Sequence, residues 1–313
     1  MKPEYLKIPM KSKDNLAYLK KEWQLYFFLI IPILLLVLFK YLPMTNIVIA
    51  FKDFNMFLKN PTWDSPWAGL KYFTQAFNDQ PFLRALRNTI VLNFLDLIVG
   101  FPAPIILALL LNELIFKKFK RFTQTVLYLP HFMSWIIIAG LSLQILSPNT
   151  GLVNNFLNNF GIKAIPFLND KNYWIVSYIL IGVWQNAGWG TILYLASMTN
   201  INPELYEAAD VDGATRWKKI WHVTLPGIKS TIIVLLILNL GRIMSIPFDR
   251  PYAIGNFFVA DYSDVISTYV YRCLQSLKFP LATAVGLFQS VVNIVFLLAA
   301  NFIAEKFGES GVL

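Results

Sequence analysis

Cysteine, histidine and charged side chains are scarce in this sequence. Its 313 residues include one cysteine, Cys273, and two histidines, and only 14% of them are charged. A single cysteine cannot form an intrachain disulfide, and no spaced Cys and His residues resemble the ligands of a zinc site. We therefore expect neither redox chemistry nor a bound metal.

A phosphate-binding loop is also missing. The pattern G-x-x-x-x-G-K-[ST] does not occur, and the Lys-Ser pair in 227-GIKS-230 lacks the glycine spacing that forms such a loop. We expect that the chain is not an enzyme, that it does not hydrolyse ATP itself, and that it binds no cofactor.

Apolar residues, by contrast, are abundant. Hydrophobic residues make up 56% of the chain and the mean hydropathy is +0.53, which is typical of a polytopic membrane protein. A bilayer core about 30 Å thick needs about 20 mostly apolar helical residues. We predict an all-α fold with six transmembrane helices, at residues 25–50, 88–111, 125–147, 173–198, 230–247 and 280–303.

The basic residues predict the orientation of these spans. Six lysines precede residue 22, and the cluster 117-KKFKR-121 follows the second span. With the N-terminus inside, 15 of the 27 basic residues lie in the cytoplasm, in agreement with the positive-inside rule. No small-residue cleavage site follows the first apolar stretch, which favours a retained span over a signal peptide. We predict cytoplasmic N- and C-termini and no nucleic-acid partner.

The spans divide the chain into three parts. We predict a basic cytoplasmic N-terminus (1–24), a transmembrane domain (25–303, with its core at 84–303) and a cytoplasmic tail (304–313). The outer loops 51–83 and 248–279 are long enough to fold over the membrane surface and contact a partner, or they are ordered connectors.

A polar segment, residues 200–229, separates the fourth and fifth spans. Asn202 suits an N-cap and Pro203 the first helical position, so a short helix should begin there. The pair Asp212-Gly213 tolerates turn conformations, so the chain should bend near Gly213. A second short helix should follow and place Trp217, Ile220 and Trp221 on one face.

Two interpretations of this helix pair are open. An amphipathic pair resting on lipid headgroups explains the tryptophans and lysines. The small residues Ala208, Ala209 and Ala214 beside Glu207 fit insertion into a protein cleft better than contact with lipid.

Specific residues resemble a known family. Glu207-Ala208-Ala209, Asp212-Gly213-Ala214 and Leu225-Pro226 resemble the EAA motif of the permease subunits of ABC importers, with Ile220 where Phe is frequent and Val223 where Ile is. The similarity runs over nearly the whole chain. It resembles the subgroup for complex polysaccharide fragments in 101-FPAPIILALLLNEL-114, 127-LYLPHFMSW-135, 203-PELYEAA-209 and 267-STYVYR-272.

The resemblance implies a function and a set of partners. The chain would be a permease in a bacterial cytoplasmic membrane, surrounded by lipid, that translocates an oligosaccharide by alternating access. Its partners would be a second permease subunit, two ATPase subunits that bind ATP and Mg, and an extracytoplasmic solute-binding protein. The implied ATPase-coupling residues, in coupling helices between spans four and five, are Glu207, Ala208, Ala209, Asp212, Gly213 and Ala214.

Polar side chains within the spans predict a substrate cavity, because such groups are costly in lipid. Tryptophan rings beside amides suit sugars, which present apolar C–H faces and hydroxyls. The predicted substrate-binding residues are Trp184, Gln185, Asn186, Trp189, Asn239, Arg242, Gln289 and Asn293. The offset from the coupling motif resembles that in maltose permeases and favours the cavity for Asn186, Trp189, Asn239 and Arg242.

Several alternatives stay open for these polar residues. Gln289 and Asn293 suit interhelical hydrogen bonding equally well. Arg242 indicates an acidic sugar, although Asp96 could equally be its buried partner. We interpret His131, near the cytoplasmic end of the third span, as structural.

Two other functions remain as alternatives. A membrane-embedded glycosyl- or lipid-transferase would need acidic or His residues clustered at an interface, whereas Asp96, His131 and the acids of the 200–229 segment are scattered along the chain. An ABC permease for a non-sugar solute is the second.

Overall fold

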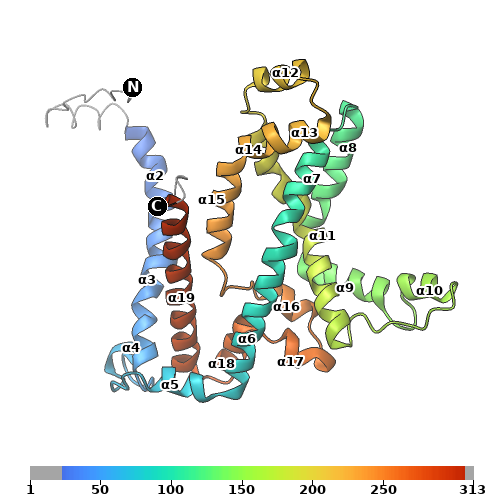
Figure 1. Cartoon of the computed structure of the whole chain (residues 1–313). Helices are drawn as coiled ribbons and strands as arrows, with labels where there is room; N and C mark the ends of the chain where they lie inside the picture. Colours follow the sequence, from blue (N-terminus) through green and yellow to red (C-terminus); the bar gives the residue numbers. More distant parts are fainter. Residues whose placement is uncertain (1–22, 307–313) are drawn as a thin grey trace, which may run out of the picture.

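A computed structural model describes residues 23–306, and every regular element within that range is a helix (Figure 1). One isolated antiparallel bridge joins Lys52 and Trp67. The predicted all-α fold is confirmed for this range. Most of the predicted basic N-terminus and of the C-terminal tail lies outside the described residues.

The helices follow one another along the chain in two halves. The first half contains α2 (Trp23–Leu36), η1 (Val37–Tyr41), α3 (Leu42–Met44), η2 (Thr45–Phe51), α4 (Pro61–Asp64), α5 (Lys71–Asn78), α6 (Gln80–Leu95), η3 (Asp96–Gly100), α7 (Pro102–Asn112), α8 (Lys117–Tyr128), η4 (Leu129–Phe132), α9 (Trp135–Leu146) and α10 (Leu152–Asn158). The second contains α11 (Lys171–Met198), α12 (Pro203–Val211), α13 (Arg216–Lys219), η5 (Ile220–Thr224), α14 (Leu225–Gly227), α15 (Lys229–Leu240), α16 (Asp249–Ile254), η6 (Phe257–Val259), α17 (Ala260–Ser263), α18 (Ile266–Gln275) and α19 (Phe279–Lys306).

Three continuous helical stretches of the described chain are long and apolar enough to cross a membrane: Tyr26–Phe51, Gln80–Asn112 and Phe279–Lys306. Two bent helix pairs raise the number to five if each pair forms one span. The 28-residue α11 is long enough, but the amides and glycines in its middle lower its hydropathy. The membrane-spanning character of the chain is therefore supported, at three to five spans by this measure.

The predicted third span, 125–147, is not one straight helix. Lys117–Phe132 and Trp135–Leu146 meet at 106°. Pro130 lies in η4, and the Ser134 side chain caps α9 by accepting from the Ile137 backbone N–H. A proline and a new N-cap thus redirect the chain, and α9 and α10 project sideways from the helices around α11 (Figure 1).

The predicted fifth span, 230–247, ends earlier than expected. Arg216–Gly227 and Lys229–Leu240 form a pair bent by 60°, and the chain after Leu240 is irregular up to Pro247. The irregular stretch begins at Gly241, directly after the last residue of α15. Residues 241–247 therefore lie beside the spans as non-helical backbone that needs hydrogen-bond partners.

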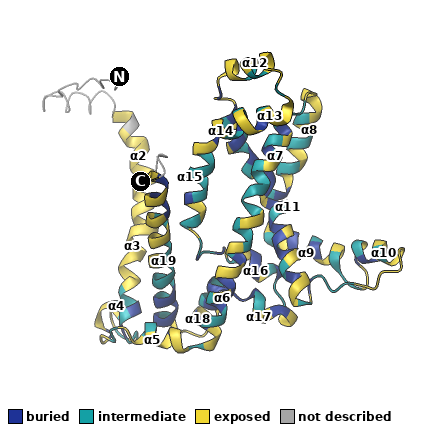
Figure 2. Cartoon of the chain, viewed as in Figure 1, coloured by how far each residue is buried: buried dark blue, intermediate teal, exposed yellow. Residues whose placement is uncertain are grey.

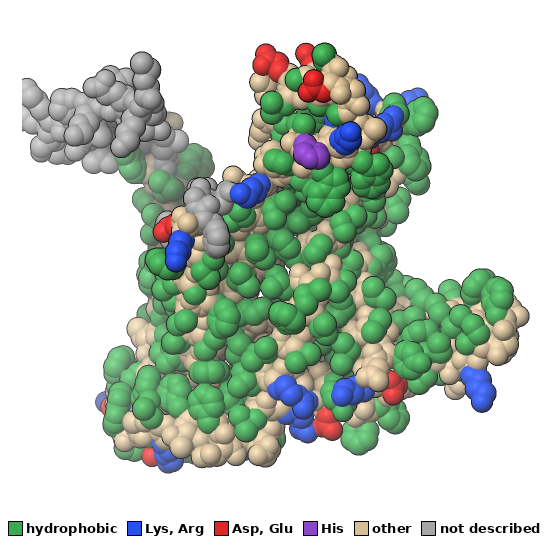
Figure 3. Space-filling view, in the orientation of Figure 1, with side chains coloured by type: hydrophobic (Ala, Val, Ile, Leu, Met, Phe, Trp, Pro, Cys, Tyr) green, Lys and Arg blue, Asp and Glu red, His purple; other side chains and the backbone are tan. Residues whose placement is uncertain are grey.

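Two groups of helices surround a central space. The first-span helices lie alongside α19 on one side of the view, and α7, α8 and α11 lie on the other (Figure 1). Most of α2 is coloured as exposed (Figure 2). Hydrophobic side chains cover the middle of the molecule, and most charged side chains gather at its two ends (Figure 3). This distribution suits a molecule embedded in a bilayer.

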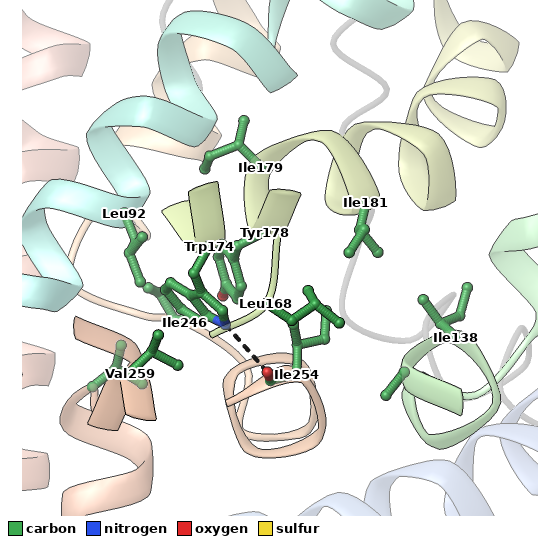
Figure 4. Close-up of a cluster of buried hydrophobic side chains, with 12 residues drawn as sticks. Leu92, Ile138, Leu168, Trp174, Tyr178, Ile179, Ile181, Ile246, Ile254 and Val259 are labelled. Atoms are coloured by element: carbon green, nitrogen blue, oxygen red, sulfur yellow. Dashed lines mark hydrogen bonds between the residues drawn. The ribbon is translucent and has the colours of Figure 1, made fainter. Parts of the chain in front are cut away.

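A buried cluster anchors the segment 246–265 to α11 (Figure 4). The rings of Trp174 and Tyr178 stack at 4.9 Å and both are fully buried. The Trp174 indole Nε1 donates to the Ile254 carbonyl at 3.2 Å. Residues far apart in sequence therefore fix the loop between α15 and α18 against the middle of the fold.

The connection 51–83, predicted as an outer loop, is an ordered structure with α4 and α5. The Asp53 carboxylate accepts hydrogen bonds from Lys71 Nζ at 2.6 Å and Tyr72 Oη at 2.7 Å. These two hydrogen bonds, with that from Lys71 the stronger, lower the pKa of Asp53. Burial, together with the bond to Asp53, raises the pKa of Tyr72 to about 12.

Candidate functional site

The 200–229 segment folds as the sequence predicts, into a helix, a bend and a second helix. The Asn202 side chain caps α12 by accepting from the Glu204 backbone N–H at 3.1 Å. Pro203 occupies the first helical position. The start of this helix is therefore set by two adjacent residues.

Gly213 makes the bend. Its φ is +69°, in the left-handed region that residues with a Cβ seldom adopt. The Ala214 N–H donates to the Ala209 carbonyl at 2.9 Å, and the Gly213 N–H donates to the Asp210 carbonyl at 3.0 Å. These two bonds form a Schellman motif, which satisfies the carbonyls at the end of α12.

Internal contacts brace the segment into one unit. Lys219 Nζ bonds Asp210 Oδ1 at 2.7 Å across the bend, and the hydroxyls of Tyr206 and Thr224 lie 2.9 Å apart. The buried side chains of Ile201 and Ile228 pack with Tyr194 of α11. A force on α12 would therefore be passed to α11 and α15.

One face of α12 carries both charged and apolar side chains that are exposed. Glu207 and Ala208 are exposed, and Val211, one turn after Glu207, is 89% exposed. Figure 3 shows acidic side chains on this end of the molecule. An exposed apolar residue one turn from an exposed carboxylate, on a capped helix, suits contact with another protein.

One detail of the prediction for this segment is wrong. Ile220 is buried, whereas Trp217 and Trp221 are 68% and 64% exposed, so the three do not share one face. The π-helical turn η5 begins at Ile220 and changes the helical spacing on which the prediction rested.

A cavity of about 760 Å³ lies between the two groups of helices. It is lined by residues of α6 to α7, α11, α15, the irregular stretch 241–247, and α19. Five of the eight predicted substrate-binding residues line this central cavity: Asn186, Trp189, Asn239, Arg242 and Gln289. These five residues come from three of the predicted spans, so positions far apart in the sequence are brought together.

Three predicted residues lie elsewhere. Trp184 lines an apolar groove of about 490 Å³ with residues of α9, on another side of α11. Gln185 is buried and is not part of the lining of the central cavity. Asn293 lies behind the cavity wall, where its side chain binds the 241–247 stretch.

Amide side chains hold the irregular stretch in place. Gln289 Nε2 donates to the Met244 carbonyl at 2.6 Å, and Asn293 Oδ1 accepts from the Met244 N–H at 3.0 Å. Asn93 Nδ2 donates to the Ile243 carbonyl at 2.7 Å. Of the two interpretations of Gln289 and Asn293, these contacts fit hydrogen bonding between helical segments.

Of the two alternatives for Arg242, the pairing with Asp96 is wrong. The Asp96 carboxylate pairs with Arg250, with Nη1–Oδ2 at 2.6 Å and Nη2–Oδ1 at 3.2 Å. Arg250 Nη2 also donates to the Tyr178 carbonyl at 2.6 Å. A bidentate pair this far inside the fold neutralises the one carboxylate that the described residues contribute to the lining of the central cavity.

The Arg250 side chain is only 10% exposed, although it reaches the lining of the central cavity. Its guanidinium lies 3.8 Å from the Tyr178 ring and 5.5 Å from the Trp135 ring. A Cβ at Gly182 would overlap the Arg250 guanidinium, so only glycine leaves room for it. Sequence reasoning missed this residue because it was assigned to an outer loop. The signal that could have found it is Asp96, a carboxylate inside a span that requires a cation.

Arg242 therefore has no carboxylate partner among the described residues. It is exposed to the central cavity, and with Asp96 neutralised by Arg250 it gives the cavity a net positive charge. Such a site favours an anionic ligand.

Trp189 is supported by an aromatic stack at the cavity wall. The His131 ring lies parallel to the Trp189 ring at 4.7 Å, and the Phe132 ring meets Trp189 edge-on at 5.5 Å. The packing role fits the structural interpretation of His131. Within residues 23–306 no group of three or more His, Cys, Asp or Glu side chains could hold a metal ion.

Comparison with known proteins gives concordant matches. Residues 100–308 match the family described as the binding-protein-dependent transport system inner membrane component. The chain is 43% identical to the polygalacturonan/rhamnogalacturonan transport system permease protein YteP of Bacillus subtilis (strain 168), over 96% of this chain and 94% of that protein.

Two solved structures are also similar. One is of a bacterial ABC transporter involved in the import of the acidic polysaccharide alginate, with a TM-score of 0.84, 40% identity, and 94% and 99% of the two chains covered. The other is of bacterial alginate ABC transporter in complex with alginate pentasaccharide-bound periplasmic protein, with a TM-score of 0.85, 40% identity, and 95% and 99% covered.

Proposed function

This chain belongs to the family of binding-protein-dependent transport system inner membrane components, and we infer from this premise that it is the permease subunit of an ABC importer for oligosaccharides or polysaccharide fragments. Its matched relatives are transport proteins, which argues against a transferase. The named polysaccharides of those relatives favour a sugar over another solute.

The complex that we propose has a second permease subunit, two ATPase subunits that bind ATP and Mg, and an extracytoplasmic binding protein. A binding-protein partner is supported by the alginate relative, which was solved with its periplasmic protein. We further propose six spans with both termini in the cytoplasm, so that α12 and the ATPases lie on the same side of a bacterial cytoplasmic membrane. The basic clusters of the sequence support this orientation.

One observation carries the coupling role, namely the capped, bent and braced α12 with Glu207 and Val211 on its exposed face. We propose that Glu207, Ala208, Ala209, Asp212, Gly213 and Ala214 form the docking surface for the ATPase. Closure of the ATPase dimer would move α12, and the bracing to α11 and α15 would carry this motion to the walls of the central cavity. Alternating access would follow.

A thiol cross-link tests this placement. The one native cysteine, Cys273, is buried. In a Val211→Cys variant, the accessible thiol is therefore the one at position 211. In the assembled complex we expect a short bifunctional reagent to link Val211→Cys to an ATPase subunit. Lys163→Cys is the control, because Lys163 is exposed in the connection between α10 and α11. No link from position 211, or a link from 163, contradicts the docking role.

The central cavity supports a path for an acidic sugar. We propose that Trp189 offers a ring face to the sugar, that Asn186 and Asn239 bind hydroxyls, and that Arg242 binds a carboxylate. Asn186 and Asn239 each donate to a carbonyl of their own helix, at 3.1 and 2.7 Å, which leaves their amide oxygens as acceptors. We propose no substrate contact for Trp184, Gln185 or Asn293.

A further inference from the structure

A second, smaller cavity of about 230 Å³ lies between α6, α11 and α17. Its polar lining consists of Arg87, Asn88, Lys171 and the Tyr262 ring. Val91 of its wall and Asn93 of the central cavity are two residues apart on α6, so they point to roughly opposite sides of the helix. The smaller cavity is therefore separate from the central one.

Two cations face one aromatic ring in this cavity. Lys171 Nζ lies 4.7 Å from the centre of the Tyr262 ring, and Arg87 Cζ lies 6.0 Å from it. Arg87 donates to Asn88 Oδ1 and to the Asp261 carbonyl. Lys171 forms no hydrogen bond or ion pair with any residue between 23 and 306, so its ammonium is free to bind an anion.

The carboxylates nearest in sequence are committed elsewhere. Asp261 pairs with Arg84, Asp264 pairs with Arg272, and Asp170 caps α11 by accepting from two backbone N–H groups. No carboxylate of the described chain lines the cavity. The site therefore has two positive charges without a compensating acid from residues 23–306.

The rest of the cavity lining is apolar, and an exposed apolar stripe continues from it. Val91, Leu92 and Ile175 complete the lining. The stripe runs along α6 from Arg87 through Val91 and Phe94 and ends at Ile98 of η3, at spacings of three and four. The last three are 44%, 55% and 54% exposed. Two cations at the end of an apolar stripe match the level of a bilayer at which lipid headgroups meet acyl chains.

We propose that this cavity binds the headgroup phosphate of an anionic phospholipid in the outer leaflet, with an acyl chain along Val91, Phe94 and Ile98. Lys171 and Arg87 bind the phosphate, and Tyr262 places the two cations. The cavity lies at the end of the molecule opposite α12, where Lys and Arg side chains gather in Figure 3. A carboxylate of a docking protein would not need the apolar stripe, which favours the lipid.

Lipid retention in the purified complex tests the proposal. The full importer, in nanodiscs of phosphatidylcholine with a small fraction of phosphatidylglycerol, is extracted and the retained lipid is measured by native mass spectrometry. We expect Lys171→Gln to lower the apparent affinity for phosphatidylglycerol about fivefold, and Lys171→Gln with Arg87→Gln about thirtyfold. Lys163→Gln removes the same charge at an exposed site and should retain the wild-type affinity.

A charge-conserving pair guards against misfolding. Lys171→Arg with Arg87→Lys keeps both cations and should keep phosphatidylglycerol bound, with an unchanged melting temperature. Equal retention in Lys171→Gln and the wild type overturns the proposal. So does displacement of the lipid by millimolar inorganic phosphate, which indicates a site for free anions.

The binding-protein alternative gives a different result. In nanodiscs of phosphatidylcholine alone, we expect the affinity for the binding protein to be the same in Lys171→Gln and the wild type. The lipid assignment is overturned in favour of a protein carboxylate if Lys171→Gln binds the binding protein much more weakly in these nanodiscs and still retains phosphatidylglycerol in the mixed nanodiscs. Each of these results is independent of ATPase coupling and of sugar specificity.

Discussion

The 200–229 segment and the central cavity differ in how far apart their partners lie along the chain. In the segment, the hydrogen bonds of the cap, the bend and the brace join residues at most 18 positions apart, as from Tyr206 to Thr224. In the cavity, Arg250 and Asp96 are 154 positions apart. The fold of the segment therefore depends mainly on residues near one another in sequence. The cavity, in contrast, forms only when several spans pack correctly.

The largest effect should come from the segment. We expect Glu207→Lys, or Gly213→Ile, to reduce sugar uptake to background while the chain remains in the membrane. Lysine reverses the charge at the proposed ATPase contact, and isoleucine cannot adopt a φ of +69° without strain. Uptake of labelled oligosaccharide by cells, with immunoblots of membranes, measures both.

Matched controls isolate these effects. Glu204→Lys makes the same charge change one turn earlier on α12, and Gly213→Asn places a residue that tolerates the left-handed region. Both should retain most of the uptake. Normal uptake in Glu207→Lys would remove the coupling role from that residue.

A change to the buried pair should instead act on stability. We expect Asp96→Asn to destabilise the chain by about 3–5 kcal/mol, because it leaves the buried Arg250 without its counter-charge. Thermal unfolding of the purified complex measures this loss. Arg250→Met combined with Asp96→Leu removes both charges, and should be more stable than either single variant. If Asp96→Asn melts like the wild type, the pair does not hold the segment 246–265.

Arg242 should act on specificity rather than on stability. We expect Arg242→Gln to lower uptake of an acidic oligosaccharide about tenfold, since one charge-assisted hydrogen bond contributes about 1.5–3 kcal/mol. Uptake of a neutral sugar of the same length should change little. Equal losses for both sugars would show that the residue does not recognise charge.

The smallest effect should come from the cap of α12. Asn202→Ala should cost about 1 kcal/mol of helix stability and lower uptake only slightly, because the brace between Tyr206 and Thr224 remains. Asn200→Ala, two positions earlier and without a capping role, is the control. Deuterium exchange of the α12 amides would detect the difference.

The same contrast explains what the sequence could predict. Asn202, Pro203 and Gly213 act on the backbone within a few residues of their own positions, so the helix and the bend could be predicted from neighbouring residues. The bend at Pro130 and Ser134 was missed because the apolar residues of 125–147 show that the stretch is buried in lipid or protein, but not whether its helix changes direction. Arg242 lines the cavity as predicted. The alternative that paired it with Asp96 is wrong, because the fifth span was drawn to residue 247 and Arg250, the actual partner, was left outside it.

Polar residues within one helix were separated only by the fold. Trp184 and Asn186 are two positions apart on α11, yet they line different hollows. Hydropathy marks such residues as unusual within a span, but it does not show which side of the helix faces the cavity. The choice between substrate contact and helix anchoring for Gln289 and Asn293 likewise required the position of Met244.

The contact between Gly182 and Arg250 constrains the order in which this protein can change over generations. A Cβ at position 182 would occupy the place of the guanidinium, so Gly182→Ala is harmful while Arg250 is present. Once a shorter, uncharged side chain replaced Arg250, and Asp96 lost its charge, alanine would fit and would favour the helix. The reverse substitution would then be blocked until glycine returned. In a lineage that first loses Arg250 and then acquires alanine at position 182, the arginine can therefore return only after glycine has returned.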